Sequence, residues 1–164
     1  MLDELKNQLT EYEIRTITKL NFAQAFEVYN TNQDFFRLTE GKNATIESSI
    51  SDIEAVPPNF DIEQKIYVSI WKDSKVLCVL DLLQDYPTQT CVYIGLLMIH
   101  GDFHGRKIGS TILTAVLNAA RIFGHKSIQL GVIENNTSGI SFWLSHGFDK
   151  IKTAKNIVVM GKKI

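Results

Sequence analysis

The sequence predicts one α/β (α+β) domain in three layers, with a mixed central sheet covered by helices on both faces. Strand-like and helix-like segments follow one another along the whole chain. An amphipathic helix connects two apolar strands between residues 99 and 127, and such a crossover makes those strands parallel neighbours. The chain has 164 residues, of which 45% are hydrophobic, so we expect a single domain over 1–164.

The first half of the chain contains two expected helices and four expected strands. Polar and β-branched residues alternate at its start, and Asn21 followed by Gln24 resembles a capping box before a helix. Pro57 and Pro58 end the second helix, and the runs after them are rich in β-branched and aromatic residues, as strands are. The expected elements are a strand over 13–20, helices over 21–30 and 44–55, and strands over 66–71, 75–83 and 90–99.

The second half begins with the crossover helix. Ile112, Val116 and Ala120 lie on one face of this helix, and Gly124 is a plausible residue to end it. The expected elements are a helix over 107–123, a strand over 127–133, a helix over 137–146, and strands over 148–152 and 157–160.

Composition excludes several classes of function. Lys and Arg total 17 against 18 Asp and Glu, and no basic run is longer than a pair, so we expect no nucleic-acid partner. The N-terminus lacks the pattern of a signal peptide and no apolar run is long enough to span a bilayer, so we expect a cytoplasmic protein without a membrane partner. Cys78 and Cys91 lie in apolar runs without metal-ligand spacing, so we expect buried free thiols and no metal.

The turn from Phe103 to Ser110 is the first candidate site. It follows a strand and opens a helix, whose first amides lack intrahelical partners and favour an anion. Gly105 and Gly109 allow a ligand to approach the main chain closely. Taken alone, the same turn is equally compatible with an ordinary solvated connection.

A second motif follows at a fixed spacing, where Asn136 precedes a short helix that ends in Gly147 and Phe148. Together with the sequence His-Gly-Arg-Lys-Ile-Gly from His104 to Gly109, this segment resembles the GNAT superfamily of acyl-CoA-dependent N-acetyltransferases. The motif-level resemblance covers Thr90 to Phe148.

The resemblance implies acetyl-CoA as co-substrate, a splayed parallel strand pair, and a pantetheine arm in the gap between those strands. It implies main-chain hydrogen bonds to that arm from Leu97, Met98 and Ile99. The loop implied to hold the pyrophosphate comprises His104, Gly105, Arg106, Lys107, Ile108, Gly109 and Ser110, and Asn136 and Trp143 are the further residues expected at the cofactor.

Both catalytic residues that the resemblance implies are replaced in this chain. Trp143 stands where many relatives have an acidic Tyr, and Gly131 stands where some carry a Glu base. Lys107 also replaces a glycine of the loop. If the backbone there has positive φ, the lysine is strained; if the backbone is helical, the lysine adds a cation beside the phosphates. The neighbouring Arg106 favours the helical interpretation.

Tyr93 and Asp81 remain as candidate catalytic residues. Tyr93 could act as an acid, relay a proton through water or bind the substrate. The alternative is a structural role as a half-buried core residue. Asp81 interrupts an apolar strand and must be paired, solvated or functional.

For the acceptor amine, the resemblance points to Phe35, Phe36 and Tyr86, near Pro57 and Pro58. The leading hypothesis is N-acetyl transfer to a primary amine of a small molecule or peptide by direct attack in a ternary complex. The alternatives are a non-catalytic coenzyme A sensor or interaction module and a structural protein of the same fold; a homodimer is compatible with each.

Overall fold

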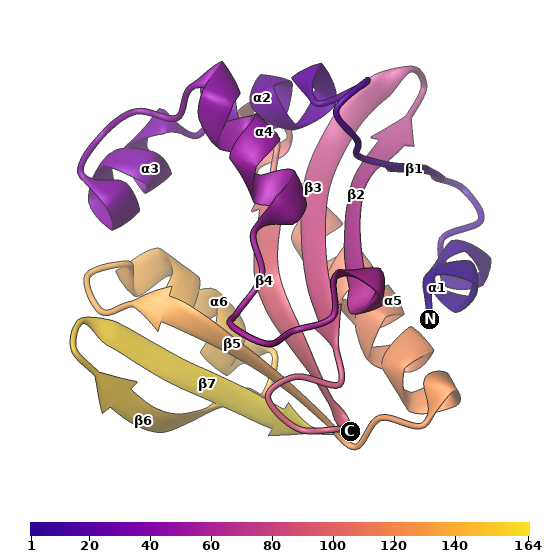
Figure 1. Ribbon diagram of the computed structural model, residues 1–164, viewed down its shortest axis with the longest axis vertical. Coiled ribbons are helices and arrows are strands. Elements are labelled where there is room, and N and C mark those ends of the chain that lie inside the picture. The colour runs from indigo at the N-terminus through magenta and orange to yellow at the C-terminus, as the bar shows by residue number, and fades with distance from the viewer.

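The computed structural model describes all 164 residues as a twisted sheet between two layers of helices (Figure 1). The strands are β1 (Glu13–Thr16), β2 (Lys65–Lys72), β3 (Lys75–Gln84), β4 (Cys91–Ile99), β5 (Ser127–Ile133), β6 (Asp149–Ala154) and β7 (Ile157–Lys163). The helices are α1 (Leu2–Gln8), α2 (Ala23–Asn30), α3 (Gln33–Glu40), α4 (Ile46–Glu54), α5 (Ile108–Phe123) and α6 (Thr137–Ser145), with short 3₁₀ segments η1 (Ile62–Gln64) and η2 (Gly101–Phe103).

The strand order is β1-β2-β3-β4-β5-β7-β6, and every neighbouring pair is antiparallel except β4 and β5. The predicted three-layer mixed sheet with one parallel pair is therefore confirmed. α5 is the crossover that makes β4 and β5 parallel.

Each face of the sheet has its own core. The main core contains 25 buried residues and lies between the sheet and α1 and α5. A second core of 10 buried residues lies under α2 and α3, on the opposite face of β2, β3 and β4. Both cysteines are buried and unpaired, as the sequence predicts. None of the helices combines the length and apolar character needed to cross a bilayer.

α5 matches its prediction because its sequence fits a buried amphipathic helix. Ile112, Val116 and Ala120 are fully buried, and Gly124 has φ 102°, the left-handed value expected of a residue that ends a helix. The amide of Gly124 donates to Ala120 and Arg121.

Several boundaries differ from the predictions. α1 and α3 form where no helix or strand was expected from the sequence, and the first strand ends at Thr16 because the chain then turns toward α2. Asn21 does not form a capping box: its side-chain oxygen accepts from the Thr18 amide at 2.6 Å, and α2 begins at Ala23 without a side-chain cap. The capping box of the structure is at α4, between Thr45 and Ser48.

A buried polar network fixes α4 on the second core. The Tyr29 hydroxyl donates to Asp52 at 2.7 Å and lies 2.7 Å from the Tyr67 hydroxyl. The Lys65 ammonium donates to the carbonyls of Asp52 and Ala55, both at 2.7 Å, and so satisfies carbonyls at the end of the helix. α4 and the loop after it are thereby held over β2 and β3, beside the cleft described next.

Candidate active site

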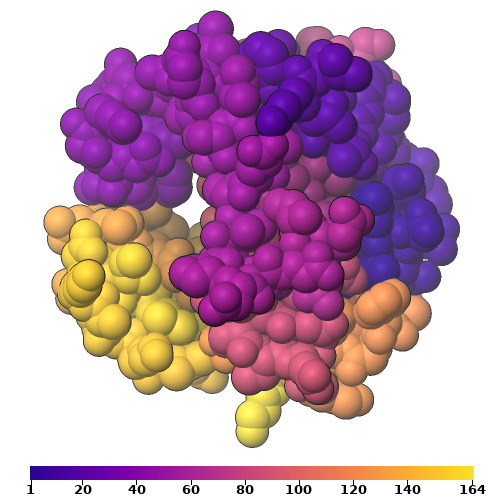
Figure 2. Space-filling model, in the orientation of Figure 1, coloured from indigo at the N-terminus to yellow at the C-terminus, as the bar shows by residue number.

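A cleft with a volume of about 960 Å³ lies between β4 and β5. The parallel ladder ends at the pair Ile94–Leu130, although β4 continues to Ile99 and β5 to Ile133, so the two strands diverge. Figure 2 shows the resulting hollow between α3 and the part of the sheet formed by β5, β7 and β6. The predicted splayed pair is therefore present.

A β-bulge lies at the point of divergence. Asp81 pairs with Leu96 and Leu82 pairs with Ile94, so Gly95 is the extra residue on β4. Gly95 is exposed to the cleft, and a Cβ at this position would lie 3.0 Å from the Asp81 carboxylate. A glycine within a strand indicates a bulge or a close approach, and this signal was available from the sequence.

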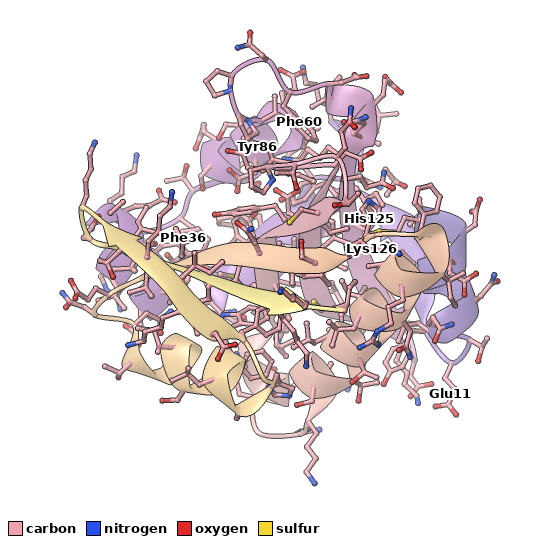
Figure 3. All side chains as sticks on the ribbon, turned by 90° about the horizontal axis from the view of Figure 1, so that it is seen from below. Glu11, Phe36, Phe60, Tyr86, His125 and Lys126 are labelled. Atoms are coloured by element: carbon pink, nitrogen blue, oxygen red, sulfur yellow. The ribbon has the colours of Figure 1, made fainter.

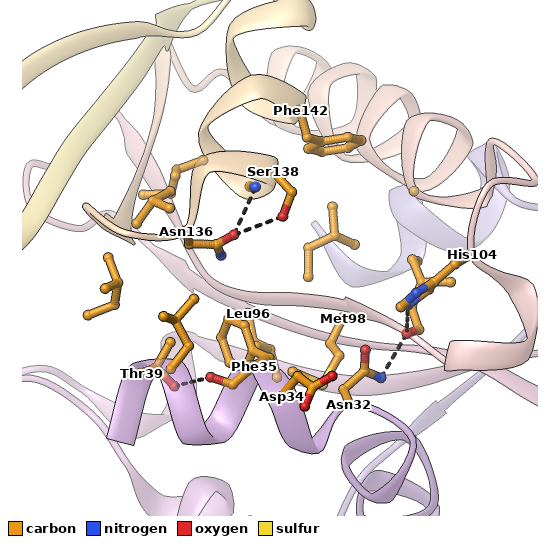
Figure 4. A pocket seen from close by; sticks show the side chains of 18 of the residues that line it. Asn32, Asp34, Phe35, Thr39, Leu96, Met98, His104, Asn136, Ser138 and Phe142 are labelled. Carbon is orange, nitrogen blue, oxygen red and sulfur yellow. Dashed lines mark hydrogen bonds between the residues drawn. The ribbon is translucent and has the colours of Figure 1, made fainter. Parts of the chain in front are cut away.

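The loop before α5 has the free amides expected of an anion site. The main-chain amides of residues 105–110 donate to no other atom of the protein. Gly105 has φ 73° and nothing within 4 Å of an added Cβ, which leaves the main chain open at this point. His104 is held against the end of β4, with Nε2 2.9 Å from the Ile99 carbonyl oxygen, which also accepts from Asn32 at 3.0 Å (Figure 4).

Lys107 does not follow the helical interpretation that Arg106 favours in the sequence. Its φ of 62° and ψ of 8° are left-handed, and it is the N-cap of α5 rather than a residue within it. Lys107 therefore occupies the conformation that a glycine adopts without strain. The Arg106 guanidinium lies over the Phe103 ring at 5.3 Å.

Asp81 forms a buried ion pair with Lys65. One carboxylate oxygen lies 3.1 Å from the Lys65 ammonium, and the side chains are 15% and 3% exposed, respectively. The other oxygen, Oδ1, is buried without a partner. Burial raises the pKa of Asp81 to about 6, while Lys65 opposes the rise. Lys65 could not be predicted from the sequence, because only the pairing of β2 with β3 brings it next to Asp81.

The Tyr93 hydroxyl lies beside Gly131, which is the first residue of β5 after the paired part of the β4–β5 ladder. A Cβ at Gly131 would lie 2.9 Å from the Tyr93 hydroxyl and 3.0 Å from Ile157, so any side chain there would displace a neighbour. The Tyr93 ring packs edge-on against Tyr86 at 5.5 Å, and Tyr86 against Phe60 at 5.9 Å. Burial raises the pKa of Tyr93, and Tyr86 adds to the rise.

Asn136 and Trp143 have structural contacts at the α6 wall of the cleft. The Asn136 side chain accepts from the Gly139 amide at 2.9 Å and from the Ser138 hydroxyl at 3.1 Å, and so caps α6 (Figure 4). Trp143 is 8% exposed, lines the cleft and packs edge-on against Phe142 at 5.0 Å.

α3 forms the opposite wall, as Figure 4 shows with Asp34, Phe35 and Thr39. Phe35 lines the cleft, but the assignment of Phe36 to the substrate site needs correction. Phe36 is 3% exposed and packs on Tyr29, because neighbouring residues of a helix point in different directions.

The remaining predicted residues divide by position. Leu97, Met98, Ile99 and Gly109 line the cleft together with His104 and Gly105. Ile108 and Ser110 begin α5, and Ser110 bonds through its hydroxyl to His146 at 2.9 Å. The structure brings together no group of three or more His, Cys, Asp and Glu suited to a metal ion.

Comparison with known proteins identifies the family. The model of the acetyltransferase (GNAT) family matches residues 25–148. The chain therefore belongs to the GNAT acetyltransferase family. No curated protein gives a significant match to the sequence.

Solved structures share the fold at low sequence identity. An acetyltransferase from Thermus thermophilus superposes with a TM-score of 0.79 at 19% identity, covering 93% of this chain and 97% of that chain. PaiA N-acetyltransferase from Thermoplasma acidophilum, in complex with coenzyme A, superposes with a TM-score of 0.70 at 19% identity, covering 93% of this chain and 99% of that chain. The ribosomal-protein-S18-alanine N-acetyltransferase from Escherichia coli superposes with a TM-score of 0.67 at 11% identity, covering 93% of this chain and 94% of that chain.

Proposed function

We infer that this protein is an acetyl-CoA-dependent N-acetyltransferase that acts on a primary amine by direct attack in a ternary complex. The acceptor nitrogen forms a bond to the acetyl carbon, the carbon–sulfur bond breaks, and the coenzyme A thiolate leaves. Bound acetyl-CoA supplies the activated acyl group as a thioester. Binding, orientation and proton movement fall to this chain and the solvent.

The run of free amides at residues 105–110 is the observation that carries this proposal. It lies at the start of a 16-residue helix, where the amides and the helix dipole favour a pyrophosphate. The loop borders a cleft whose β4 edge has lost its pairing to β5 beyond Ile94. The main-chain groups of Leu97, Met98 and Ile99 that point away from β3 are thus available for an extended pantetheine arm, apart from the Ile99 carbonyl oxygen, which is occupied by His104 and Asn32; this fit supports acetyl-CoA as the ligand.

Asp81 is our candidate for the group that receives the proton of the acceptor amine. It lies against Gly95, where the missing side chain leaves the carboxylate close to the cleft. Its pKa of about 6 leaves it ionised at neutral pH, and the oxygen that faces Gly95 is Oδ2, because Oδ1 is buried. Lys65 is a positioning residue, because its ammonium lies 3.1 Å from this same Oδ2.

The proton for the departing thiolate has a different source. Trp143 is buried, and an indole is not an acid suited to this step. The Tyr93 hydroxyl or solvent in the open cleft supplies the proton. An amide of the bulged segment near Leu97 is the donor we assign to the developing oxyanion.

Turnover and binding together test the proposal. Purified protein is incubated with acetyl-CoA and a panel of primary amines, and free thiol is measured against hydrolysis without amine. Amine-dependent thiol release supports the transferase. Tight acetyl-CoA binding without release would instead select a coenzyme A sensor, the alternative that the residues at Gly131 and Trp143 favour.

A further inference from the structure

The junction between α2 and α3 is fastened to the end of β4. Asn32 donates through Nδ2 to the Ile99 carbonyl oxygen at 3.0 Å, and the Gly101 amide donates to the Thr31 hydroxyl at 2.9 Å. The two main chains also approach closely, because a Cβ on Gly101 would lie 2.9 Å from the Thr31 carbonyl oxygen. We call this set of contacts the α3 clasp.

Asn32 does not cap α3, although it occupies the N-cap position. An asparagine at this position normally accepts from an amide of the first turn and stabilises the helix by about 1 kcal/mol. The Asn32 side chain makes no such bond, and its Nδ2 donates instead to Ile99 and, at 2.9 Å, to the Val28 carbonyl oxygen. The sequence thus places a bond to β4 where a stabilising cap would otherwise form.

Few other contacts fix α3 beside the sheet. Phe36 is its single buried residue and lies toward one side of the molecule (Figure 3). Gln33 and Arg37 bond to Ala44 and Asn43, which belong to the loop after the helix. No side chain of α3 hydrogen-bonds to a strand. The position of α3 along β4 therefore depends on the α3 clasp.

The Ile99 carbonyl oxygen also connects the α3 clasp to the loop before α5. His104 lies with Nε2 2.9 Å from this oxygen, and because a carbonyl only accepts, Nε2 carries the hydrogen (Figure 4). Beyond Ile94, β4 is paired with β3 alone. A ligand bound along the free edge of β4 and at the loop therefore restricts the Ile99 peptide and, through Asn32, the start of α3.

The position of α3 sets the width of the cleft in front of the bulge. Asp34, Phe35 and Leu38 of α3 line the cleft opposite β5 and α6, and Gly95 lines it at the bulge. The Asp81 carboxylate approaches the cleft at Gly95. A displacement of α3 would therefore move one wall of the space in which an acceptor meets Asp81.

We propose that Asn32 is a positioning residue that couples the coenzyme site to the acceptor site. Coenzyme A bound at the loop and along β4 fixes α3 through the Ile99 carbonyl oxygen and Asn32, and so strengthens binding of the acceptor. This coupling is reciprocal, so the acceptor strengthens coenzyme binding by the same factor. The proposal rests on the N-acetyltransferase function inferred above.

Hydrogen exchange of the α3 amides, measured with and without coenzyme A, tests the proposal without an acceptor. Coenzyme A should slow this exchange by about fivefold or more in the wild type, the lower end of typical coupling between sites. Asn32→Ala should bind coenzyme A within about threefold of the wild-type affinity, and its α3 amides should respond by less than about twofold. A wild type that binds coenzyme A without a change in α3, or an equal change in Asn32→Ala, would overturn the proposal. A wild type that does not bind coenzyme A would refute the function inferred above instead.

Two further variants separate coupling from helix stability. Asn32→Asp keeps an oxygen that can cap α3 but has no donor for Ile99, so α3 should stay folded and lose its response to coenzyme A. Asn43→Ala is the matched control, because it removes the 2.8 Å bond from Arg37 near the other end of α3 and should keep the response. A response retained in Asn32→Asp, or lost in Asn43→Ala, would contradict the role of Asn32.

Steady-state kinetics with an amine that the turnover assay identifies adds a second readout. Asn32→Ala should raise KM for the amine by about tenfold and change kcat by less than about threefold, because the wall is displaced while the reacting groups remain. An unchanged KM for the amine would contradict the coupling to the acceptor site.

Discussion

Replacement of Asp81 by Asn tests the proposed proton acceptor through the pH dependence of turnover. The pKa of Asp81 is raised from 3.8 to about 6 because burial disfavours the anion, so the base is lost as the pH falls through about 6. A group with this pKa is about 90% ionised at pH 7 and about 10% ionised at pH 5. The wild-type rate should therefore fall about tenfold over this interval for this reason alone.

Protonation of the acceptor amine lowers kcat/KM further as the pH falls, with a slope of about one in a plot of log kcat/KM against pH. The wild-type slope should thus approach two below about pH 6, and that of Asp81→Asn should remain near one. The ratio of the two rates removes any constant effect of the substitution, including that of leaving Lys65 without its carboxylate.

Steady-state kinetics at several pH values, with circular dichroism of each variant, measures this ratio. Asp73→Asn is the matched control, because Asp73 is an exposed carboxylate in the β2–β3 turn. A wild-type to Asp81→Asn ratio that stays constant from about pH 7 to about pH 5 would refute the role of Asp81 as base.

Three further substitutions test individual residues of the cleft. Tyr93→Phe should reduce turnover by about 10²-fold if the hydroxyl transfers a proton, and a loss below about threefold in kinetics would assign that step to solvent. Asn136→Ala should lower the free energy of unfolding in urea by about 1 kcal/mol, because it removes the side-chain cap of α6. Asn135→Ala removes no side-chain hydrogen bond and should leave the stability unchanged. Equal effects of the two substitutions would contradict the capping role of Asn136. Lys107→Gly should raise the free energy of unfolding by about 1 kcal/mol, because the backbone of Lys107 is left-handed with φ 62°. Lys155→Gly is the matched comparison, because Lys155 has φ 56° in a hairpin turn. A Lys107→Gly protein that is less stable than the wild type would show that the left-handed backbone carries no strain.

The second half of the fold is the part that the sequence predicts best. α5, β5 and α6 have long periodic patterns that end in clear signals, such as Gly124 after α5. The short helices α1 and α3 were not predicted, because seven or eight residues hold only two turns and their apolar residues gain order from tertiary packing.

The candidate site could be predicted from the sequence where ligand binding depends on main-chain groups. The loop before α5 and the splayed strands follow from spacing and resemblance, since side-chain identity matters little there. Contacts that depend on strand register were not predictable, and these include the Lys65–Asp81 pair and the position of Ile157 beside Gly131. Lys107 was misjudged because left-handed backbone is expected of glycine, and a lysine gives no signal of it.

Acetyl-CoA binding to the wild type and to Gly109→Trp, measured by titration calorimetry, tests the central claim most directly. Gly109 lies at the start of α5, where an added Cβ would be 3.6 Å from both Ile99 and Phe142, so an indole there would fill the cleft beside the free amides. Thr114→Trp places the same group on an exposed turn of α5 as control. We predict binding to the wild type and to the control, and affinity more than about tenfold weaker in a folded Gly109→Trp. Equal affinity in all three proteins, or no binding to the wild type, would contradict the assignment of this cleft to acetyl-CoA.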